Sequence, residues 1–470
     1  MSRSLRLLIL AVLLVALVAV TTLCVGLQTG AIGSQSVLEV ATTGDLRDLF
    51  APHDPGGPTL VDVSLRKLES DFYRPIDPQT PIAGEAAGLH TLLSAKKLPD
   101  SSLPTETANG NPRDDGARAG ELLGYAEQHY ASGIGPNGKD DLTDAALRGL
   151  MNSVHDPYTV YLSPREIEGL NESLSGGNFG GIGVYIYQLK DGRIIVQPIE
   201  GMPAARAGIT PGEIIDTVDG TPVRGLNIDR VETMIRGETG TLVRLRAHPY
   251  SAPSSERVFQ IVREVIHVPT VRAKMEDGID YIRLSDFGTT SADEVRKALL
   301  DGRAHGARGY ILDLRDNGGG LLEAAVEISS FFVPQGTIVS TIRRDGQRTT
   351  EEALGDAIDG LRPVVLLVNK YTASASEITA GALQDYGIAA LVGTRTFGKG
   401  VVQSIYPLPD RGALKITTAR YLTPAGRDIQ HHGIEPNVVV EQNADDPALI
   451  DTPADRQLAA AKARFHSTKR

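Results

Sequence analysis

The chain has 470 residues, of which 41% are hydrophobic and 22% are charged, so it can bury the cores of about two to four domains. Its formal net charge is −11 and no stretch is rich in lysine or arginine, which argues against nucleic-acid binding. The single cysteine, Cys24, excludes an intrachain disulfide and a cysteine-based zinc site, and it argues against a catalytic thiol.

The first residues predict a membrane segment. Arg3 and Arg6 precede an uncharged run, residues 7–27, that is long enough to cross a bilayer as a helix. Positive charge before such a run predicts a cytoplasmic amino terminus, with all later residues outside the cytoplasm. The run is longer than the roughly 7–15 residues of a signal-peptide core, which favours an anchor. Cleavage after Ala31 would instead give a secreted protein, so residues 1–33 are assigned to a signal or an anchor.

Residues 34–167 are predicted to form a polar, mainly helical region. Two stretches within it, 72–93 and 129–151, share the same order of an aromatic-ended helix, a Pro/Gly turn and an amphipathic helix. This similarity indicates a degenerate internal duplication. Residues 94–117 are rich in Pro, Ser, Asp and Asn, which predicts a flexible linker between the two stretches.

Short strands and turns begin near residue 168. A glycine turn at 180–184 precedes a run of alternating residues, which is typical of a strand. Further strands are expected at 194–196, 214–218, 241–247 and 257–263, with short helices at 204–208 and 229–236.

This order, together with the stretch 203–209 and the Asp219–Gly220 turn, resembles a PDZ domain over residues 168–265. Backbone N–H groups of a glycine loop can capture a chain-terminal carboxylate, and the adjacent strand edge can pair with the peptide. The candidate peptide-binding residues are Gly180, Gly181, Ile182, Gly183 and Val184. The alternative is a small β-rich domain whose glycines serve only turns.

Strands and helices alternate in residues 266–441. Two apolar strands, at 309–314 and 364–368, each lead through a turn into a helix, at 321–332 and 374–386. Two such units close together predict an α/β layer. Further strands are expected near 390–393, 401–406 and 414–421. Residues 442–470 are expected to form a polar tail with a short helix at 454–464.

Ser374 lies where the second of these strands becomes a helix. A serine at this point is exposed, and the helix amino terminus stabilises negative charge beside it. A hydroxyl nucleophile needs a base. None of the ten histidines lies in a compelling motif, and the adjacent pair His431 and His432 fits a surface loop. We therefore consider a lysine base.

Lys399 is the candidate base because glycines flank it on both sides and allow close approach of the backbone. Phe397 and the following valines could remove water from its ammonium group, and burial favours the neutral amine that a base requires. If 399–405 is a strand, Gln403 shares a face with Lys399 and could orient its amine. By itself, such a lysine also fits an ordinary surface turn.

The third element is the glycine-rich turn that contains Gly318, Gly319 and Gly320. A turn of this kind after a strand can aim backbone N–H groups at a developing oxyanion. It could also bind phosphate. It matches neither a P-loop nor a dinucleotide-binding fingerprint, because the required spacing is absent.

Four stretches together resemble the carboxyl-terminal processing peptidases: 312–320, 372–378, 396–403 and 413–436. In that family a PDZ domain precedes the catalytic core, as it does here. The resemblance covers residues 125–441 and implies Ser374 as nucleophile, Lys399 as general base and Gln403 as the residue that orients Lys399.

The resemblance further implies an oxyanion hole formed by the N–H of Ala375 and one N–H of the Gly318–Gly320 turn. It also implies that movement of the PDZ domain switches the enzyme between resting and active states. Arg206 is a candidate for that coupling, although a solvated helix charge is the simpler interpretation. Ser376, two residues after Ser374, is interpreted as a capping or packing residue.

The expected fold is therefore an α/β protease core with a β-rich PDZ domain, a helical amino-terminal region and a membrane segment. The expected function is a serine endopeptidase that cleaves exported proteins near their carboxyl termini through an acyl-enzyme. Its partners would be protein substrates bound through their carboxyl termini, and we expect no metal or cofactor. The alternatives are a catalytically silent PDZ scaffold and a non-peptidase serine hydrolase. Whether chains associate into a homo-oligomer is left open.

Overall fold

The computed structural model describes residues 56–99, 102–174, 179–358, 360–361, 363–409, 412–442 and 449–466. The predicted membrane segment, residues 1–33, lies outside these ranges. Within the described part of the chain, no helix is both long and apolar enough to span a membrane.

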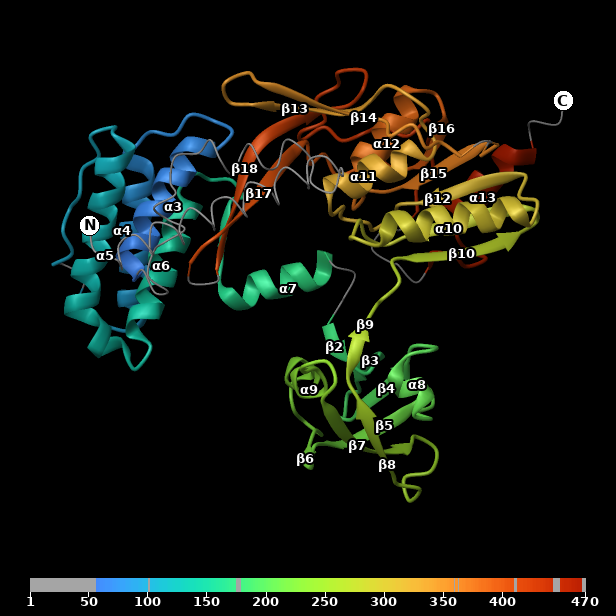
Figure 1. Ribbon diagram of the computed structural model, residues 1–470, viewed down its shortest axis with the longest axis horizontal. Coiled ribbons are helices and arrows are strands. Elements are labelled where there is room, and N and C mark those ends of the chain that lie inside the picture. Colours follow the sequence, from blue (N-terminus) through green and yellow to red (C-terminus); the bar gives the residue numbers. More distant parts are fainter. Residues whose placement is uncertain are drawn as a thin grey trace, which may run out of the picture. The chain divides into compact units, whose positions relative to one another are not determined.

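Four helices form the amino-terminal region of the described chain (Figure 1). They are α3 (Gly57–Asp71), α4 (Gln79–Ala95), α5 (Pro112–Ile134) and α6 (Gly138–Asn152). Helix α3 packs on α5 and α4 packs on α6, which gives two similar helix pairs, while the duplication itself stays a prediction. Helix α5 starts inside the expected linker 94–117, because Asn111 caps it by accepting a hydrogen bond from the N–H of Arg113.

The chain next enters the domain that resembles a PDZ domain. Helix α7 (Pro164–Leu174) runs across the expected boundary at residue 168, so the first strand of the domain is β2 (Phe179–Gly181). The remaining elements are β3 (Val184–Gln188), β4 (Ile194–Pro198), α8 (Pro203–Arg206), β5 (Glu213–Val218), β6 (Thr221–Pro222), α9 (Ile228–Ile235), β7 (Leu242–Pro249), β8 (Arg257–Val262) and β9 (Glu264–Ile266). The main sheet has the order β3-β4-β5-β7-β8, and β2 pairs with β9, so the chain enters and leaves the domain side by side.

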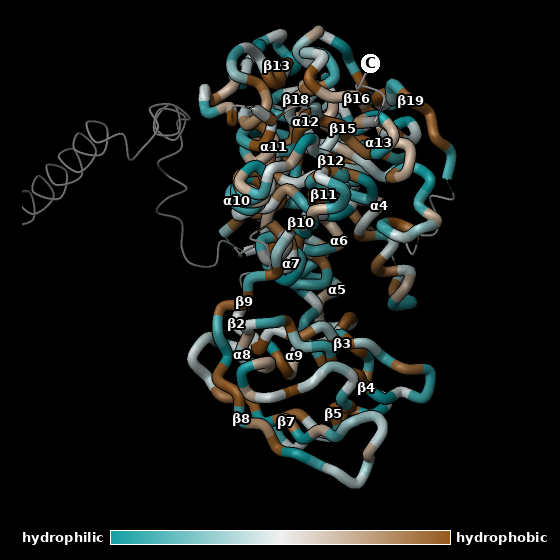
Figure 2. Tube along the Cα trace, turned by 90° about the vertical axis from the view of Figure 1, so that its right-hand side faces the viewer, coloured by the Kyte–Doolittle hydropathy of each residue, from teal (hydrophilic) through white to brown (hydrophobic). Residues whose placement is uncertain are grey.

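A largely parallel sheet forms the core that the sequence predicted as an α/β layer. Its elements are β10 (Val271–Glu276), β11 (Ile279–Leu284), α10 (Ser291–Ala304), β12 (Gly309–Asp313), α11 (Leu322–Ser330), β15 (Val364–Val368), α12 (Ala375–Asp385), β16 (Ala389–Gly393) and β19 (Val438–Val439). The strand order is β10-β11-β12-β15-β16-β19, and only the β10–β11 pair is antiparallel. Strand β15 is apolar and buried at every position because helices cover both faces of the sheet. Figure 2 shows hydrophobic segments, in brown, within this part of the chain.

A second sheet is built around the long strand β18. Its strands are β1 (Val160–Leu162), β13 (Thr337–Arg343), β14 (Arg348–Glu352), β17 (Val401–Pro407) and β18 (Ala413–Leu422). Strand β18 pairs with β1, β13 and β17. Leu414 and Ile416 of β18 belong to the same hydrophobic cluster as the leucines of α3 to α6, so the helical region is packed onto this sheet.

The short helix expected at 454–464 is present, but it packs onto the sheet and is not part of a free polar tail. Helix α13 (Arg456–His466) buries Leu458 and Ala461 against the parallel sheet, where they contact a cluster that includes Ile311 and Val365. Helices α10, α11 and α12 supply the cluster on the opposite face. The expectation of a polar tail failed because only a few apolar residues of a mostly polar segment face the sheet.

Candidate active site

Three turns follow the carboxyl ends of the adjacent parallel strands β12, β15 and β16. These turns carry the glycines 318–320, Ser374 and Lys399. Because the carboxyl ends of parallel strands meet at one edge of a sheet, residues far apart in the sequence converge there. They line one cavity of about 600 Å³. The cavity-lining residues used below are Gly318, Gly319, Gly320, Ser374, Ala375, Lys399, Gln403 and Lys415.

Ser374 occupies a strained turn. It lies at the start of a helix, as the sequence predicted, where it is the amino-terminal cap of α12, and its backbone has φ 58° and ψ −119°. Residues other than glycine seldom adopt a positive φ, and such a backbone conformation costs about 1–3 kcal/mol. Strain of this size persists only where neighbouring contacts hold it, and here the N–H of Ser374 donates to Glu377 at 3.0 Å.

Glu377 connects the serine turn to the lysine loop. One of its carboxylate oxygens, Oε2, accepts hydrogen bonds from the backbone N–H groups of Ser374 and Lys399, at 3.0 and 2.9 Å. The other, Oε1, accepts from the N–H of Gly398 at 2.8 Å and from the hydroxyl of Thr396 at 2.5 Å. Glu377 is fully buried, and its two carboxylate oxygens accept four hydrogen bonds from protein donors, which replace the water that burial removes.

Lys399 lies in a partly dehydrated position. Its Nζ is 4.6 Å from the centre of the Tyr158 ring, whereas the side chain of Phe397 is 54% exposed. Phe397 and the following valines were expected to cover the ammonium group; Val401 and Val402 line the cavity with Lys399, whereas Phe397 does not. The glycine flanks were read correctly: a Cβ at Gly398 would lie 2.7 Å from the backbone nitrogen of Gly433, so the backbones do approach closely.

Burial, and after it the positive charge of Lys415, lower the pKa of Lys399 to about 8. The carboxylates of Asp156 and Glu377 act in the opposite direction. Asp156 is buried and accepts hydrogen bonds from the hydroxyls of Thr159 and Thr417. The combined effect places the titration of this lysine near neutral pH, where a neutral amine is accessible.

The glycine turn lies directly against the serine. A Cβ at Gly319 would be 2.7 Å from the Cβ of Ser374, and the residue has φ 105°, so only glycine fits there. The N–H of Gly319 already donates to the Asn317 side chain at 2.9 Å. The N–H groups of Gly318, Gly320 and Ala375 donate to no other described residue.

The argument that placed Gln403 on the same strand face as Lys399 was wrong. Strand β17 begins only at Val401, and a β-bulge between Val402 and Gln403 interrupts the alternation of side chains. Gln403 nevertheless lines the cavity, with its Nε2 3.4 Å from the hydroxyl of Thr417. Among the described contacts there is no hydrogen bond from Lys399 to Ser374 or to Gln403.

Ser376 is fully buried and donates its hydroxyl to the carbonyl of Asn317 at 3.0 Å. It therefore packs the serine turn against the glycine turn, as its interpretation as a packing residue requires.

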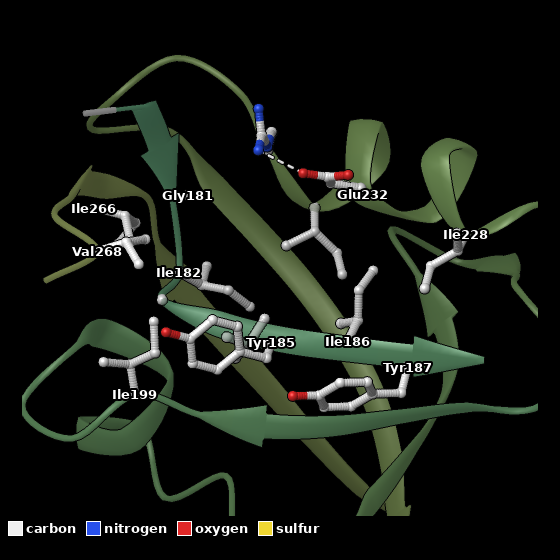
Figure 3. Close-up of a pocket in the computed structure, with 14 residues that line it drawn as sticks. Gly181, Ile182, Tyr185, Ile186, Tyr187, Ile199, Ile228, Glu232, Ile266 and Val268 are labelled. Carbon is white, nitrogen blue, oxygen red and sulfur yellow. Dashed lines mark ion pairs between the residues drawn. The ribbon is translucent and has the colours of Figure 1, made fainter. Parts of the chain in front are cut away.

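The PDZ domain contains a separate groove of about 330 Å³ (Figure 3). Strand β3 borders it with the edge that no other described strand pairs with, and α9 borders it with Ile228, Glu232 and Ile235, which lie on one helix face. Of the predicted peptide-binding residues, Gly181, Ile182, Gly183 and Val184 line the groove.

Gly180, the fifth predicted residue, does not line the groove. It lies in the β2–β9 pair, where its carbonyl accepts from the N–H of Gly237. A Cβ at this position would meet the Gly237 carbonyl at 2.0 Å, so close backbone packing explains the glycine.

Arg206 forms an ion pair with Glu264 of β9 at 2.5 Å, and both side chains are half exposed. An exposed pair of this kind contributes little stability, about 0–1 kcal/mol. It does connect α8 to one of the two strands through which the chain joins the domain.

Three residues near the site were missed at the sequence level. Glu377 had a readable signal, because Ser374 and Glu377 have the spacing of a helix capping box. Tyr158 and Lys415 had none, since the pairing of β1 and β17 with β18 brings Tyr158 against Lys399 and Lys415 to the cavity.

Comparisons with known proteins relate two parts of the chain to described families. Residues 278–440 match peptidase family S41, and residues 194–247 match the PDZ domain. A carboxy-terminal-processing protease of Bartonella bacilliformis is 35% identical over 74% of this chain and 80% of its own length. A carboxyl-terminal-processing protease of Synechocystis sp. is 38% identical over 68% of this chain and 76% of its own length. The photosystem II D1 C-terminal processing protease structure has 27% identity and a TM-score of 0.45, and the match covers 82% of this chain and 93% of that one.

Replacing Glu377 by glutamine should disturb the site without changing its shape. Either orientation of the amide removes two acceptors and turns an NH₂ group towards N–H or O–H donors. We expect turnover of an unstructured protein substrate to fall by about tenfold or more. The control is Glu323→Gln, because Glu323 lines the same cavity but binds no described residue. Wild-type turnover in Glu377→Gln would contradict the positioning role.

Proposed function

The chain belongs to peptidase family S41 and is a serine-type carboxyl-terminal-processing protease, and we propose that Ser374 and Lys399 carry out its peptide-bond hydrolysis. The observation that carries the proposal is the shared carboxylate of Glu377, which binds the backbones of both residues at the edge of one cavity. A lysine whose pKa is lowered to about 8 is partly neutral at that pH and can serve as the base that a serine hydroxyl needs.

The first step forms an acyl-enzyme. Neutral Lys399 takes the proton from the Ser374 hydroxyl, and Oγ attacks the scissile carbonyl carbon. The resulting oxyanion is stabilised by the N–H of Ala375 and by the N–H of either Gly318 or Gly320. Gly319 is not used, because its N–H is bound to Asn317. Gln403 accepts a hydrogen bond from the Lys399 amine and orients it.

Collapse of this intermediate breaks the peptide bond, and protonated Lys399 gives its proton to the leaving amine. In the second step, neutral Lys399 takes a proton from water, which attacks the acyl carbon. The carboxyl product leaves as the proton returns to Oγ of Ser374. No step requires a metal or a cofactor.

We further propose that the PDZ groove binds the carboxyl terminus of the substrate. The carbonyls of Ile182 and Gly183 accept hydrogen bonds from Ala204 and Ile199, which holds the glycine loop in place. Its amide side can then capture a carboxylate, while the free edge of β3 adds the peptide as a strand. Peptide binding would gate activity through β2 and β9, with the Arg206–Glu264 ion pair contributing.

For the amino terminus we propose a membrane anchor at residues 7–27, which places the catalytic part outside the cytoplasm. Cleavage after Ala31 would release the protein. Recovery of the intact chain from the soluble cytoplasmic fraction would argue against both.

Ser374→Ala and Lys399→Ala should each reduce casein cleavage by about a thousandfold or more, since nucleophile and base act as a unit. Ser376→Ala is the control for the wrong serine, and it should keep most of the activity because Ser376 does not line the cavity. Full activity in either of the first two variants would refute the assignment.

The rate should depend on pH through Lys399. Only the neutral amine is a base, so kcat/KM should rise with pH and level off above the pKa of about 8. Lys415→Gln removes a positive charge that lowers this pKa, so its profile should shift to higher pH. Lys297→Gln, a change at the exposed surface, should leave the profile unchanged. A flat profile between about pH 6 and 9 would exclude a lysine base.

Binding of a tail peptide should need its free carboxylate. Amidation should weaken binding to the inactive Ser374→Ala protein by about tenfold or more, because a charge-assisted interaction is lost. Ile186→Asp, within the groove, should have a similar effect, whereas Val258→Asp on the exposed strand β8 should not. Calorimetric titration measures the affinity of the free peptide, of the amidated peptide and of the two variants. Equal affinities in all of them would contradict the proposal.

A further inference from the structure

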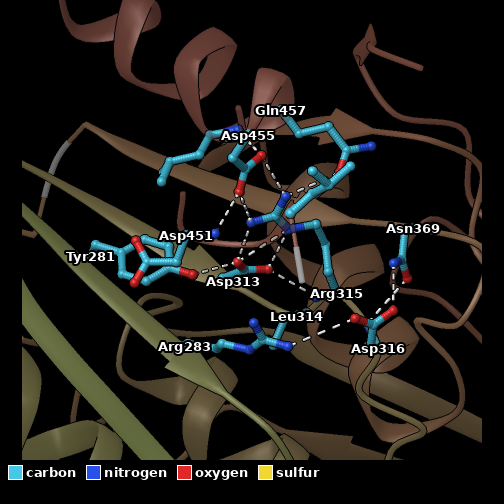
Figure 4. Close-up of polar contacts among 12 residues, drawn as sticks. Tyr281, Arg283, Asp313, Leu314, Arg315, Asp316, Asn369, Asp451, Asp455 and Gln457 are labelled. Atoms are coloured by element: carbon cyan, nitrogen blue, oxygen red, sulfur yellow. Dashed lines mark hydrogen bonds and ion pairs between the residues drawn. The ribbon is translucent and has the colours of Figure 1, made fainter. Parts of the chain in front are cut away.

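A fully buried ionic cluster lies at the start of the glycine turn (Figure 4). Arg315 lies two residues after the end of β12 and is 1% exposed. Its Nε and Nη2 donate to the carboxylate of Asp313 at 2.9 and 2.6 Å. The hydroxyl of Tyr281 donates to the same carboxylate at 2.7 Å. The Nη1 and Nη2 groups of Arg315 can still donate to a second partner.

That partner comes from the carboxyl-terminal segment. Nη1 and Nη2 of Arg315 donate to the two oxygens of Asp455 at 2.9 and 2.8 Å, in a bidentate pair. Nη1 also donates to Oε1 of Gln457 at 3.2 Å. Figure 4 shows Asp455 and Gln457 on the opposite side of the guanidinium from Asp313.

Asp455 is itself held firmly. Its Oδ1 accepts from the N–H of Leu458, and its Oδ2 accepts from the N–H of Asp451, both at 2.9 Å. The carboxylate therefore caps α13 and binds Arg315 at the same time. Loss of the carboxylate would leave guanidinium donors buried without a partner, which is a costly state.

Arg315 lies two residues before Asn317 in the sequence, and Asn317 connects the glycine turn to the turn that carries Ser374. The carbonyl of Asn317 accepts from the N–H of Ala373 at 3.0 Å, and its side chain holds the N–H of Gly319. Asp316 is fixed in the same way, since its N–H donates to Asn369 at 3.1 Å. A shift of Arg315 would therefore be transmitted to the glycines that face Ser374.

We propose that Asp455 is a positioning residue of the active site: it holds Arg315, and through it the glycine turn that stabilises the oxyanion. The inference rests on the proposed function of Ser374 and its oxyanion hole. It makes the last described helix a part of the catalytic apparatus, although α13 contributes no residue to the cavity that surrounds Ser374.

The test compares Asp455→Asn with Leu458→Ala in the full-length protein. Both changes weaken α13, but only the first removes the charge that holds Arg315. We expect Asp455→Asn to lower kcat by about tenfold to a hundredfold, because small displacements of catalytic groups have effects of this size. KM and the affinity of the PDZ domain for a tail peptide should not change.

A peptide aldehyde separates positioning from stability. Its adduct with Ser374 places an oxyanion at the glycine turn, so its affinity for Asp455→Asn should fall by the same factor as kcat. Leu458→Ala should lower the unfolding temperature but keep wild-type kcat and aldehyde affinity. If Asp455→Asn shows only the lower unfolding temperature, the proposal is overturned.

Two further comparisons keep the outcomes distinct. If Asp455→Asn does not fold, Asp455→Glu decides: it keeps the charge but moves the carboxylate by one methylene, and wild-type kcat would overturn the proposal. An active Ser374→Ala protein would refute the proposed function whatever Asp455 does. An inactive Ser374→Ala protein together with wild-type kcat in Asp455→Asn would refute the positioning role alone.

Discussion

The buried carboxylate of Glu377 is the contact on which the arrangement of the site depends. It accepts hydrogen bonds from the backbones of Ser374 and Lys399, which lie in two different turns of the sheet edge. Because both of its oxygens are saturated, neither turn can shift without leaving a buried donor unpaired. The strained conformation of Ser374 is maintained by this constraint rather than by the preference of its own sequence.

Residues outside the parallel sheet contribute to the surroundings of Lys399. Tyr158 comes from the loop after the helical region, and Lys415 comes from β18 of the second sheet. Strand β1 brings the first close to the second by pairing Val160 with Lys415. The helical region is thus packed into the site's surroundings, and it helps to set the charge state of Lys399.

The sequence predicted the strand–turn–helix units, the PDZ domain and the turns that meet at the cavity, because apolar strands, glycine turns and helix starts are local patterns. It placed Phe397 over Lys399 and Gln403 on the face of Lys399, and both placements failed. Exposure of Phe397 and the bulge before Gln403 depend on tertiary packing, which local alternation does not record. For the same reason the polar carboxyl-terminal segment gave no sign that Asp455 is buried against Arg315.

The pairing of β1 with β18 has a consequence for the order in which the protein can become active. Val160 and Lys415 are separated by most of the chain, and closing so long a loop is slow compared with local folding. During synthesis, the helices and the PDZ domain are complete long before β18 emerges from the ribosome. A nascent chain therefore lacks the paired β1 and β18, and with them the complete surroundings of Lys399, until nearly all of the protein has been made.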